Sequence, residues 1–269
     1  MKHLTGILFF VCMVALPCAA EETPPGTRSP IEIVVHRGAN HIAPENTRAA
    51  AQACIDLGVD YVEVDVQMSR DGVFYIMHDF TVSRTTDGVG FLSLMEAEAI
   101  DKLDAGSWFS PEFKGEAVPR LKEYLEWLKG QAKVYFDVKQ GDVERLIALV
   151  YETGMEKDCF FWFGNDMLLE QFRALDRDLP LKINANTPEQ VAQAVEQYGA
   201  SIVETGLASL TPEFVAACRE RNVRIMVFEK ENTPEMFRRI LASEADMVNL
   251  DRPKIFIEVL REREDTLPE

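Results

Sequence analysis

The sequence lacks several patterns that would assign it to common protein classes. It has no Cys-x-x-Cys pair and no Cys/His metal spacing, and no Gly-x-Gly-x-x-Gly or Gly-x-x-x-x-Gly-Lys loop follows its first strand-like segment. Basic residues number 28 against 45 acidic ones, which gives a net charge of −17. These absences weigh against nucleotide binding by such a loop and against a nucleic-acid partner, because non-specific nucleic-acid binding needs a basic surface.

An apolar run long enough for a membrane-spanning helix, about 20 residues, is also missing. Residues 4–16 form an apolar run of 13 after Lys2, and the small residues at 18–20 suit cleavage before Glu21. We therefore expect a signal peptide at residues 1–20, with export to the periplasm or secretion. A lipid anchor on Cys18 is the weaker expectation, because Pro17 is a poor residue directly before such a cysteine.

Cysteine is scarce as well. Removal of a signal peptide leaves Cys54, Cys159 and Cys218, an odd number, each in an apolar stretch. This pattern favours buried thiols over a disulfide framework. An exported protein can contain one disulfide, and the sequence leaves its pairing open. Hydrophobic residues make up 47% of the chain, which is enough to form a core and argues against disorder.

Strand-like and helix-like segments alternate between a polar linker at residues 21–30 and a polar tail at 263–269. Eight segments are rich in apolar and β-branched residues, as strands are: 31–35, 61–68, 134–138, 160–163, 181–184, 202–204, 224–228 and 247–250. Three of the helical segments between them begin with Thr-Pro-Glu, a helix-start pattern. This alternation predicts an α/β fold, a (β/α)8 TIM barrel over residues 31–262, rather than an open doubly wound sheet or two small domains.

One connection is too long for a plain turn. Residues 79–119, between the second and third barrel strands, have turn and short-helix character throughout. We expect an insertion there that stands over the carboxyl end of the barrel, where active sites of this fold are built.

The second strand carries two acidic side chains on one parity. In residues 61–67 the valines alternate with Glu63 and Asp65. If the valines face the surrounding helices, both carboxylates point into the barrel mouth. Two like charges side by side are costly unless a cation neutralises them or one of them is protonated, and carboxylate oxygens suit Ca²⁺ or Mg²⁺. The alternative, a strand whose charges face water, is unusual for a parallel barrel strand.

The third strand repeats this pattern. Tyr135, Asp137 and Lys139 share one parity, so Asp137 and Lys139 should face inward at the carboxyl end. Asp137 would then complete a three-carboxylate site for one divalent cation, and Lys139 would contact an anionic substrate oxygen. The alternative is a structural ion pair between Asp137 and Lys139 inside the barrel.

Histidine is scarce, with four residues in the chain. His36 follows the first strand directly, and His78 ends an apolar segment that an Asp-Gly turn could fold back on the second strand. A two-residue turn would place His78 opposite Asp65. We expect His41 in a solvated loop. His36 and His78 are therefore the candidates for proton transfer near neutral pH.

Three segments have a distinctive order and spacing: HRGANHIAPENT at 36–47, GVDYVEVDVQMSRDG at 58–72 and HDFTVSRTTDGVG at 78–90. Together they resemble the signature of the glycerophosphodiester phosphodiesterases. Residues 105–125 and the LDRP at 250–253 resemble further parts of the family pattern. The resemblance is specific because it rests on an ordered set of motifs, and it is dense from residue 31 to about 140 and sparse afterwards.

The resemblance implies a TIM barrel and a divalent-metal hydrolase. By position it implies two catalytic acid/base histidines, two cations that contact phosphate and three metal-binding carboxylates: His36 and His78, Arg37 and Lys139, and Glu63, Asp65 and Asp137. The sequence departs from the family pattern at two places. The third metal ligand is usually glutamate, one methylene longer than Asp137, and the usual Trp-Thr-Val-Asn stretch is replaced by FEKE at 228–231. The second departure bears on substrate identity more than on the reaction type.

We therefore expect hydrolysis of glycerophosphodiesters to sn-glycerol 3-phosphate and an alcohol, with one divalent cation, Ca²⁺ or Mg²⁺, as cofactor. The partner would be a small-molecule phosphodiester, and the oligomeric state is open. Two alternatives are a phosphodiesterase of the same fold that acts on lysophospholipids or another lipid or envelope phosphodiester, and a non-catalytic barrel that binds phosphoesters. The aromatic run 160–163 is either a ligand platform or a packed layer. Lys182, Asn184 and Glu204 either line the pocket or pack.

Overall fold

Eight parallel strands form the barrel that the alternation predicts, in a computed structural model that describes residues 31–264. The signal peptide and linker predicted at 1–30, and residues 265–269 of the predicted tail, lie outside the described residues. Within 31–264, no helix is both long and apolar enough to cross a membrane. The three cysteines of this range, Cys54, Cys159 and Cys218, are buried free thiols, as expected.

The barrel strands follow the predicted segments closely. They are β1 (Glu32–Val35), β2 (Tyr61–Met68), β4 (Lys133–Val138), β5 (Cys159–Phe163), β6 (Lys182–Asn184), β7 (Ile202–Thr205), β8 (Arg224–Phe228) and β9 (Met247–Leu250). The order in the sheet is β5-β4-β2-β1-β9-β8-β7-β6, so the first and the last barrel strand pair in parallel. A parallel bridge between Phe161 and Leu181 joins the two remaining edges, and the ring is nearly closed.

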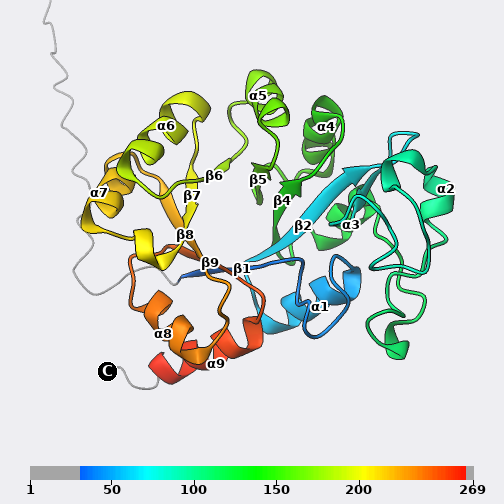
Figure 1. Cartoon of the computed structure of the whole chain (residues 1–269), viewed down its shortest axis with the longest axis horizontal. Helices are drawn as coiled ribbons and strands as arrows, with labels where there is room; N and C mark the ends of the chain where they lie inside the picture. Colours follow the sequence, from blue (N-terminus) through cyan, green and yellow to red (C-terminus); the bar gives the residue numbers. More distant parts are fainter. Residues whose placement is uncertain (1–30, 265–269) are drawn as a thin grey trace, which may run out of the picture. The chain divides into compact units, whose positions relative to one another are not determined.

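Helices surround these strands (Figure 1). They are α1 (Arg48–Leu57), α3 (Leu121–Leu128), α4 (Val143–Thr153), α5 (Asp166–Leu175), α6 (Pro188–Tyr198), α7 (Pro212–Glu220), α8 (Pro234–Leu241) and α9 (Pro253–Glu264). Thr187, Thr211 and Thr233 cap α6, α7 and α8, and each hydroxyl accepts a hydrogen bond from a backbone N–H of the first turn. Proline follows each of them at the first helical position, which confirms the three predicted helix starts.

Alternate residues of each strand face different layers. The outward side chains, among them Val62, Val64 and Val66, belong to the core between barrel and helices. Inward side chains near the amino ends form an apolar floor inside the barrel: Val34, Tyr61, Tyr135, Phe160, Ile202, Met226 and Met247. The next inward residues along β2 and β4 are the acidic ones, because side chains repeat every second residue. The parity predicted for these two strands is therefore confirmed.

Charged side chains lie beneath the apolar floor. Lys133 Nζ donates to Glu32 Oε1 at 2.8 Å, and the Arg224 guanidinium binds the other Glu32 oxygen. The Lys133 ammonium lies 4.8 Å from the centre of the Tyr61 ring, which belongs to the floor. Paired charges and apolar rings thus fill the amino end of the barrel.

The chain between β2 and α3 leaves the barrel, as the predicted insertion requires. It contains β3 (Phe74–Ile76), which pairs antiparallel with β2, and then η1 (Leu92–Leu94), α2 (Ala97–Ile100) and η2 (Pro111–Phe113). This segment lies at the right of Figure 1. It has an apolar core of its own: Tyr75, Met77, Val82, Leu92, Ala97, Ile100, Ala105 and Val118.

The predicted length of the turn between β2 and β3 is wrong, because the turn has one residue more than the two predicted. Residues 70–72 connect the strands, with Gly72 in the left-handed region at φ 85°. Three-residue hairpin loops commonly end with such a residue, and they shift the register relative to a two-residue turn. Met77, and not His78, therefore lies opposite Asp65, and Met77 N donates to Asp65 O at 2.8 Å. His78 lies one position beyond this pair, where the insertion begins.

Candidate active site

Three carboxylates meet at the carboxyl ends of β2 and β4. Glu63 and Asp65 extend from β2 and Asp137 from β4, and Asp65 and Asp137 are direct partners in the parallel register. One oxygen of each carboxylate lies within 4.8 Å of the others, and none of the three residues is more than 9% exposed. The structure thus brings together the three metal ligands that strand parity and the family resemblance predicted.

This carboxylate cluster fits a hard divalent cation. Glu63 Oε1 and Asp137 Oδ1 are buried and accept no hydrogen bond within the described residues. Burial raises the pKa of Glu63 well above its usual range, and the charge of Asp65 raises it further. Burial and Asp65 also raise the pKa of Asp137, although Lys139 opposes the shift. A cation stabilises carboxylates that repel one another, and an all-oxygen ligand set suits Ca²⁺ or Mg²⁺.

The loop after β1 holds two of these carboxylates in place. Arg37 N donates to Glu63 Oε2 at 2.5 Å, and Asn46 Nδ2 donates to Asp65 Oδ2 at 2.7 Å. Asp65 N in turn donates to Asn46 Oδ1 at 3.2 Å. Arg37 and Asn46 have φ values of 58° and 59°, a strained conformation for residues other than glycine. These contacts fix one oxygen of each carboxylate. Within the described residues, the other oxygen of Glu63 has no hydrogen-bond partner, and that of Asp65 faces Lys139 Nζ at 3.0 Å.

Two basic side chains, Lys139 and Arg37, border the carboxylate cluster. Lys139 Nζ lies 2.7 Å from Asp137 Oδ2 and 3.0 Å from Asp65 Oδ1. Arg37 Nε lies 3.6 Å from Asp65 Oδ2, and Arg37 Nη1 lies 3.2 Å from Glu45 Oε1. Burial works against protonation of Lys139, but the charges of Asp65 and Asp137 raise its pKa above the usual range. Both predicted phosphate ligands are therefore at the site, and the alternative Asp137–Lys139 ion pair is present as well.

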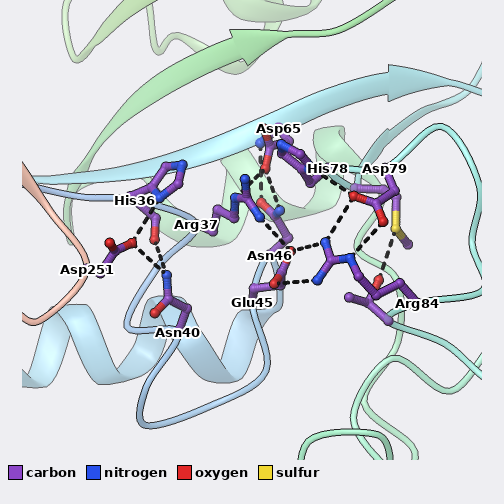
Figure 2. A network of polar contacts seen from close by, with 12 residues as sticks. His36, Arg37, Asn40, Glu45, Asn46, Asp65, His78, Asp79, Arg84 and Asp251 are labelled. Atoms are coloured by element: carbon purple, nitrogen blue, oxygen red, sulfur yellow. Dashed lines mark hydrogen bonds and ion pairs between the residues drawn. The ribbon is translucent and has the colours of Figure 1, made fainter. Parts of the chain in front are cut away.

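His36 and His78 each contact a carboxylate through Nδ1 (Figure 2). His36 Nδ1 lies 2.9 Å from Asp251 Oδ1, and His78 Nδ1 lies 2.7 Å from Asp79 Oδ1. In this view the two rings lie on opposite sides of the Arg37 side chain. A carboxylate at Nδ1 orients the ring and leaves Nε2 to exchange a proton with a substrate.

Arg84, in the insertion, binds Asp79, the same carboxylate that contacts His78. Arg84 Nε donates to Asp79 Oδ2 at 2.7 Å, and its two Nη atoms donate to Glu45 at 2.7 and 2.9 Å. The hydrogen bond from Arg84 lowers the pKa of Asp79 to about 2, with burial opposing and His78 adding to the shift. Arg84 therefore links the insertion to the loop after β1 and neutralises part of the Asp79 charge.

Besides His36, the carboxylate of Asp251 contacts two amide side chains. Asn40 Nδ2 donates to Asp251 Oδ1 at 3.2 Å, and Asn232 Nδ2 lies 3.5 Å from Asp251 Oδ2. Burial opposes protonation of His36, but the hydrogen bond with Asp251 and the charge of Glu63 raise its pKa to about 9. The same contact lowers the pKa of Asp251 against the effect of burial, so the pair favours a protonated ring beside an ionised carboxylate.

The aromatic run on β5 is mainly a packed layer, which is the second of the two predicted alternatives. Phe160 belongs to the apolar floor and stacks on Tyr135 with ring centres 4.4 Å apart. Phe161 and Phe163 face the helices, in the outer core. Trp162 is half-buried and packs against the floor from the inward side.

The polar residues of β6 and β7 form an internal network of their own. Lys182 Nζ donates to Glu204 Oε2 at 2.6 Å and to Asn184 Oδ1 at 2.9 Å, and it lies 4.6 Å from the Trp162 ring centre. Burial lowers the pKa of Lys182, although Glu204 opposes the shift. Lys182 therefore packs inside the barrel, and Asn184 is exposed at its rim. His41 is exposed in the loop after β1, as expected.

The model of the glycerophosphoryl diester phosphodiesterase family matches residues 36–255, a range that contains the whole site. The chain belongs to this family. A glycerophosphodiester phosphodiesterase of Caldanaerobacter subterraneus is 30% identical over 240 residues, which cover 85% of this chain and 97% of the relative. These matches make the chain a phosphodiesterase of the glycerophosphoryl diester type.

Two solved structures have the same fold as this chain. The crystal structure of a glycerophosphodiester phosphodiesterase from Agrobacterium tumefaciens matches with a TM-score of 0.82 at 38% identity, over 85% of this chain and 100% of the other. An Oleispira antarctica phosphodiesterase, solved in complex with the product sn-glycerol-3-phosphate, matches with a TM-score of 0.74 at 24% identity, over 86% and 96%. At that identity, the second likeness shows the fold alone.

The two departures from the phosphodiesterase family pattern lie close to the site. Asp137 is shorter than the usual glutamate, yet one of its oxygens still lies within the carboxylate cluster while the other contacts Lys139. Phe228, the first residue of the divergent FEKE stretch, packs its ring edge against His36 with centres 6.1 Å apart. The predicted third ligand therefore lies in the carboxylate cluster, and the altered stretch reaches a catalytic candidate.

Sequence reasoning missed the residues that hold the two histidines. Asp79 and Arg84 lie inside a family-like segment, and adjacency to His78 was an available signal for Asp79. Asp251 lies within LDRP, but only the pairing of β1 with β9 brings it to His36. No periodicity in the sequence identifies that contact.

Proposed function

We propose that this family member hydrolyses glycerophosphodiesters to sn-glycerol 3-phosphate and an alcohol, with a divalent cation bound by Glu63, Asp65 and Asp137. The observation that carries the proposal is the buried carboxylate cluster, bordered by two cations and by two histidines that each have a carboxylate at Nδ1. The Oleispira antarctica phosphodiesterase, which shares the fold, holds sn-glycerol-3-phosphate, the product proposed here.

Two basic side chains of the protein, Lys139 and Arg37, would bind the phosphate. A divalent cation, when bound, supplies positive charge that stabilises the non-bridging phosphoryl oxygens. Lys139 and the Arg37 guanidinium lie at the same carboxylates and present further N–H donors to those oxygens. The phosphodiester is thereby held in the barrel mouth despite the protein's net charge of −17.

The two histidines would carry the proton transfers. In the first half-reaction the substrate's glycerol 2-hydroxyl attacks phosphorus, His78 Nε2 takes the hydroxyl proton, and His36 Nε2 donates a proton to the departing alcohol. Water then opens the cyclic phosphate, with His36 as the acceptor and His78 as the donor. The assignment rests on the proton that Asp251 holds on His36 and on the orientation that Asp79 gives to His78.

The two alternative functions receive less support from the site. A lipid substrate would be favoured by an apolar groove at the β5 aromatic run, but Phe160, Phe161 and Phe163 are buried in packed layers. A binding protein without turnover has no use for two histidines oriented by carboxylates. The polar mouth favours a water-soluble glycerophosphodiester.

The direct test is alcohol release by the purified protein. Glycerophosphocholine is incubated with the chelated protein after addition of Ca²⁺ or Mg²⁺, and free choline and sn-glycerol 3-phosphate are measured. We expect equal amounts of both products with at least one cation. Release of choline from lysophosphatidylcholine but not from glycerophosphocholine would support the lipid alternative, and tight binding without release would support the binding protein.

A further inference from the structure

His78 does not lie on a barrel strand, so its place over the carboxylate cluster needs a separate support. It follows β3 by two residues, within the chain between β2 and α3. Asp79 orients the ring, but Asp79 belongs to the same connecting segment and is itself 29% exposed at its side chain. Arg84 ties the Asp79 side chain to Glu45 of the loop after β1, and the backbone on either side of His78 has a separate contact from a barrel strand.

Gln67 of β2 provides that contact. Its Nε2 donates to Met77 O at 2.7 Å and to Asp79 O at 2.6 Å, the backbone carbonyls on either side of His78. Gln67 is fully buried, and its Oε1 accepts no hydrogen bond within the described residues. The orientation of the amide is determined by these partners, because an oxygen in place of the nitrogen would face two carbonyl oxygens.

The position of Gln67 couples the histidine to the metal-binding carboxylates. Glu63, Asp65 and Gln67 are alternate residues of one strand, so Gln67 lies about 7 Å further along the inward face than Asp65. The β2–β3 hairpin is already held without it, since Met77 N donates to Asp65 O and β3 pairs with β2 over three residues. The two Gln67 hydrogen bonds therefore add a restraint on the segment that carries His78.

We infer that Gln67 is a positioning residue, which sets the distance and direction of the His78 imidazole relative to the carboxylate cluster. The inference rests on the proposed function, because it takes proton transfer as the role of His78. Gln67 touches no substrate in this account. It acts by fixing the backbone on either side of His78. Loss of its two hydrogen bonds lets His78 move by a fraction of an ångström or more, and proton transfer does not tolerate such a displacement.

The test is Gln67→Met, which keeps the volume of the side chain and removes both donors. We expect a fall in kcat of about 10- to 100-fold, the range seen when an outer partner of a catalytic group is lost, with little change in KM and in cation affinity. Gln140→Met is the matched control. Gln140 Nε2 also donates to a carbonyl of β2, Met68 O at 2.8 Å, but Gln140 is half-buried and holds neither carbonyl next to His78, so kcat should stay near that of the wild type.

A double-mutant cycle separates positioning from a general structural effect. In a His78→Ala background, Gln67→Met should cost no further activity, because the residue whose position it sets is gone. Equal losses of kcat with and without His78, or a wild-type kcat in Gln67→Met, would overturn the inference. If Gln67→Met does not fold, Gln67→Asn, which keeps an amide but is too short to reach both carbonyls, is measured in the same cycle. A wild-type protein that released no choline from glycerophosphocholine would contradict the proposed function instead.

Discussion

Asp251 Oδ1 lies 2.9 Å from His36 Nδ1, although 215 residues separate them in the sequence. The contact joins the ends of the first and the last barrel strand, which are paired in the sheet. Of the contacts that favour the charged form of His36, the hydrogen bond with Asp251 is the strongest. The contacts with Asp251 and Glu63 raise the pKa of His36 by more than burial lowers it. The proton on His36 therefore depends on closure of the barrel.

Replacement of Asp251 by asparagine should lower the pKa of His36 from about 9, because burial would then act with less opposition. We expect the alkaline limb of the kcat/KM profile to move to lower pH. On that limb, kcat/KM of the variant should lie below that of the wild type by roughly tenfold for each pH unit of the shift. The stability that protonated His36 contributes, present below about pH 6.5 and lost as the pH rises through about 9, should shrink in parallel. The profile and the pH dependence of urea unfolding measure both effects. Asp178→Asn, at an exposed residue of the α5–β6 loop, should change neither.

Loss of either catalytic candidate should abolish most of the turnover. We expect His36→Ala and His78→Ala each to lower kcat by about 10²- to 10⁴-fold, since each removes one proton transfer. His41→Ala is the matched control, because His41 is exposed in the loop after β1 and should leave kcat unchanged. Choline release at saturating glycerophosphocholine gives the comparison. Full activity of His36→Ala would remove His36 from the mechanism.

Neutralisation of Glu63 should have opposite effects on the metal-free and the metal-loaded protein. Burial and Asp65 make the ionised form costly, so Glu63→Gln should raise the thermal midpoint in a chelator at pH 7, by about 2–4 °C for each kcal/mol relieved. The same change should abolish the increase in midpoint that Ca²⁺ or Mg²⁺ gives the wild type. Since the pKa of Glu63 is raised in the folded protein, the metal-free wild type should gain stability as the pH falls from 7 toward 4.5, and the advantage of the variant should disappear there. Scanning calorimetry with and without cation checks each sign, and Glu112→Gln on η2 is the exposed control.

Removal of Arg84 should slow the reaction without a large loss of stability. Arg84→Ala frees Asp79 and Glu45, so we expect kcat to fall by about 10- to 100-fold and the insertion to exchange its amide protons faster. Arg70→Ala is the control within the same chain segment. Its guanidinium pairs with Glu96 at the surface, and such exposed pairs contribute about 0–1 kcal/mol. Equal kinetics in the two variants would show that Asp79 keeps its orientation without Arg84.

The parity of β2 and β4 made the carboxylate cluster predictable from the sequence. Valines on one face and acids on the other are informative in a strand that is covered on its outer side, and the structure brings Glu63, Asp65 and Asp137 together as that pattern requires. The alternation of segments gave all eight barrel strands for the same reason, since each apolar run must be buried.

Contacts made by turns and by distant segments were not predictable in this way. One extra residue in the β2–β3 loop moved His78 out of the register expected for it, and loop length is not encoded in strand periodicity. The contacts of Asp251 with His36 and of Arg84 with Glu45 depend on how loops meet above the barrel. A pattern of period two or 3.6 carries no information about such partners.

The apolar floor also closes the amino end of the barrel. Its seven side chains are at most 5% exposed, and the ion pairs of Glu32 lie below them, so exchange with water takes place through the carboxyl end. The carboxylate cluster lies deeper than Arg84 and the loops that surround it. Under the proposed function, a cation that enters through the carboxyl end would have to bind before the phosphodiester covers its site, and it would stay there until the product departs. An ordered sequence of binding and release would follow from the proposal, in which excess substrate slows the reloading of metal-depleted protein.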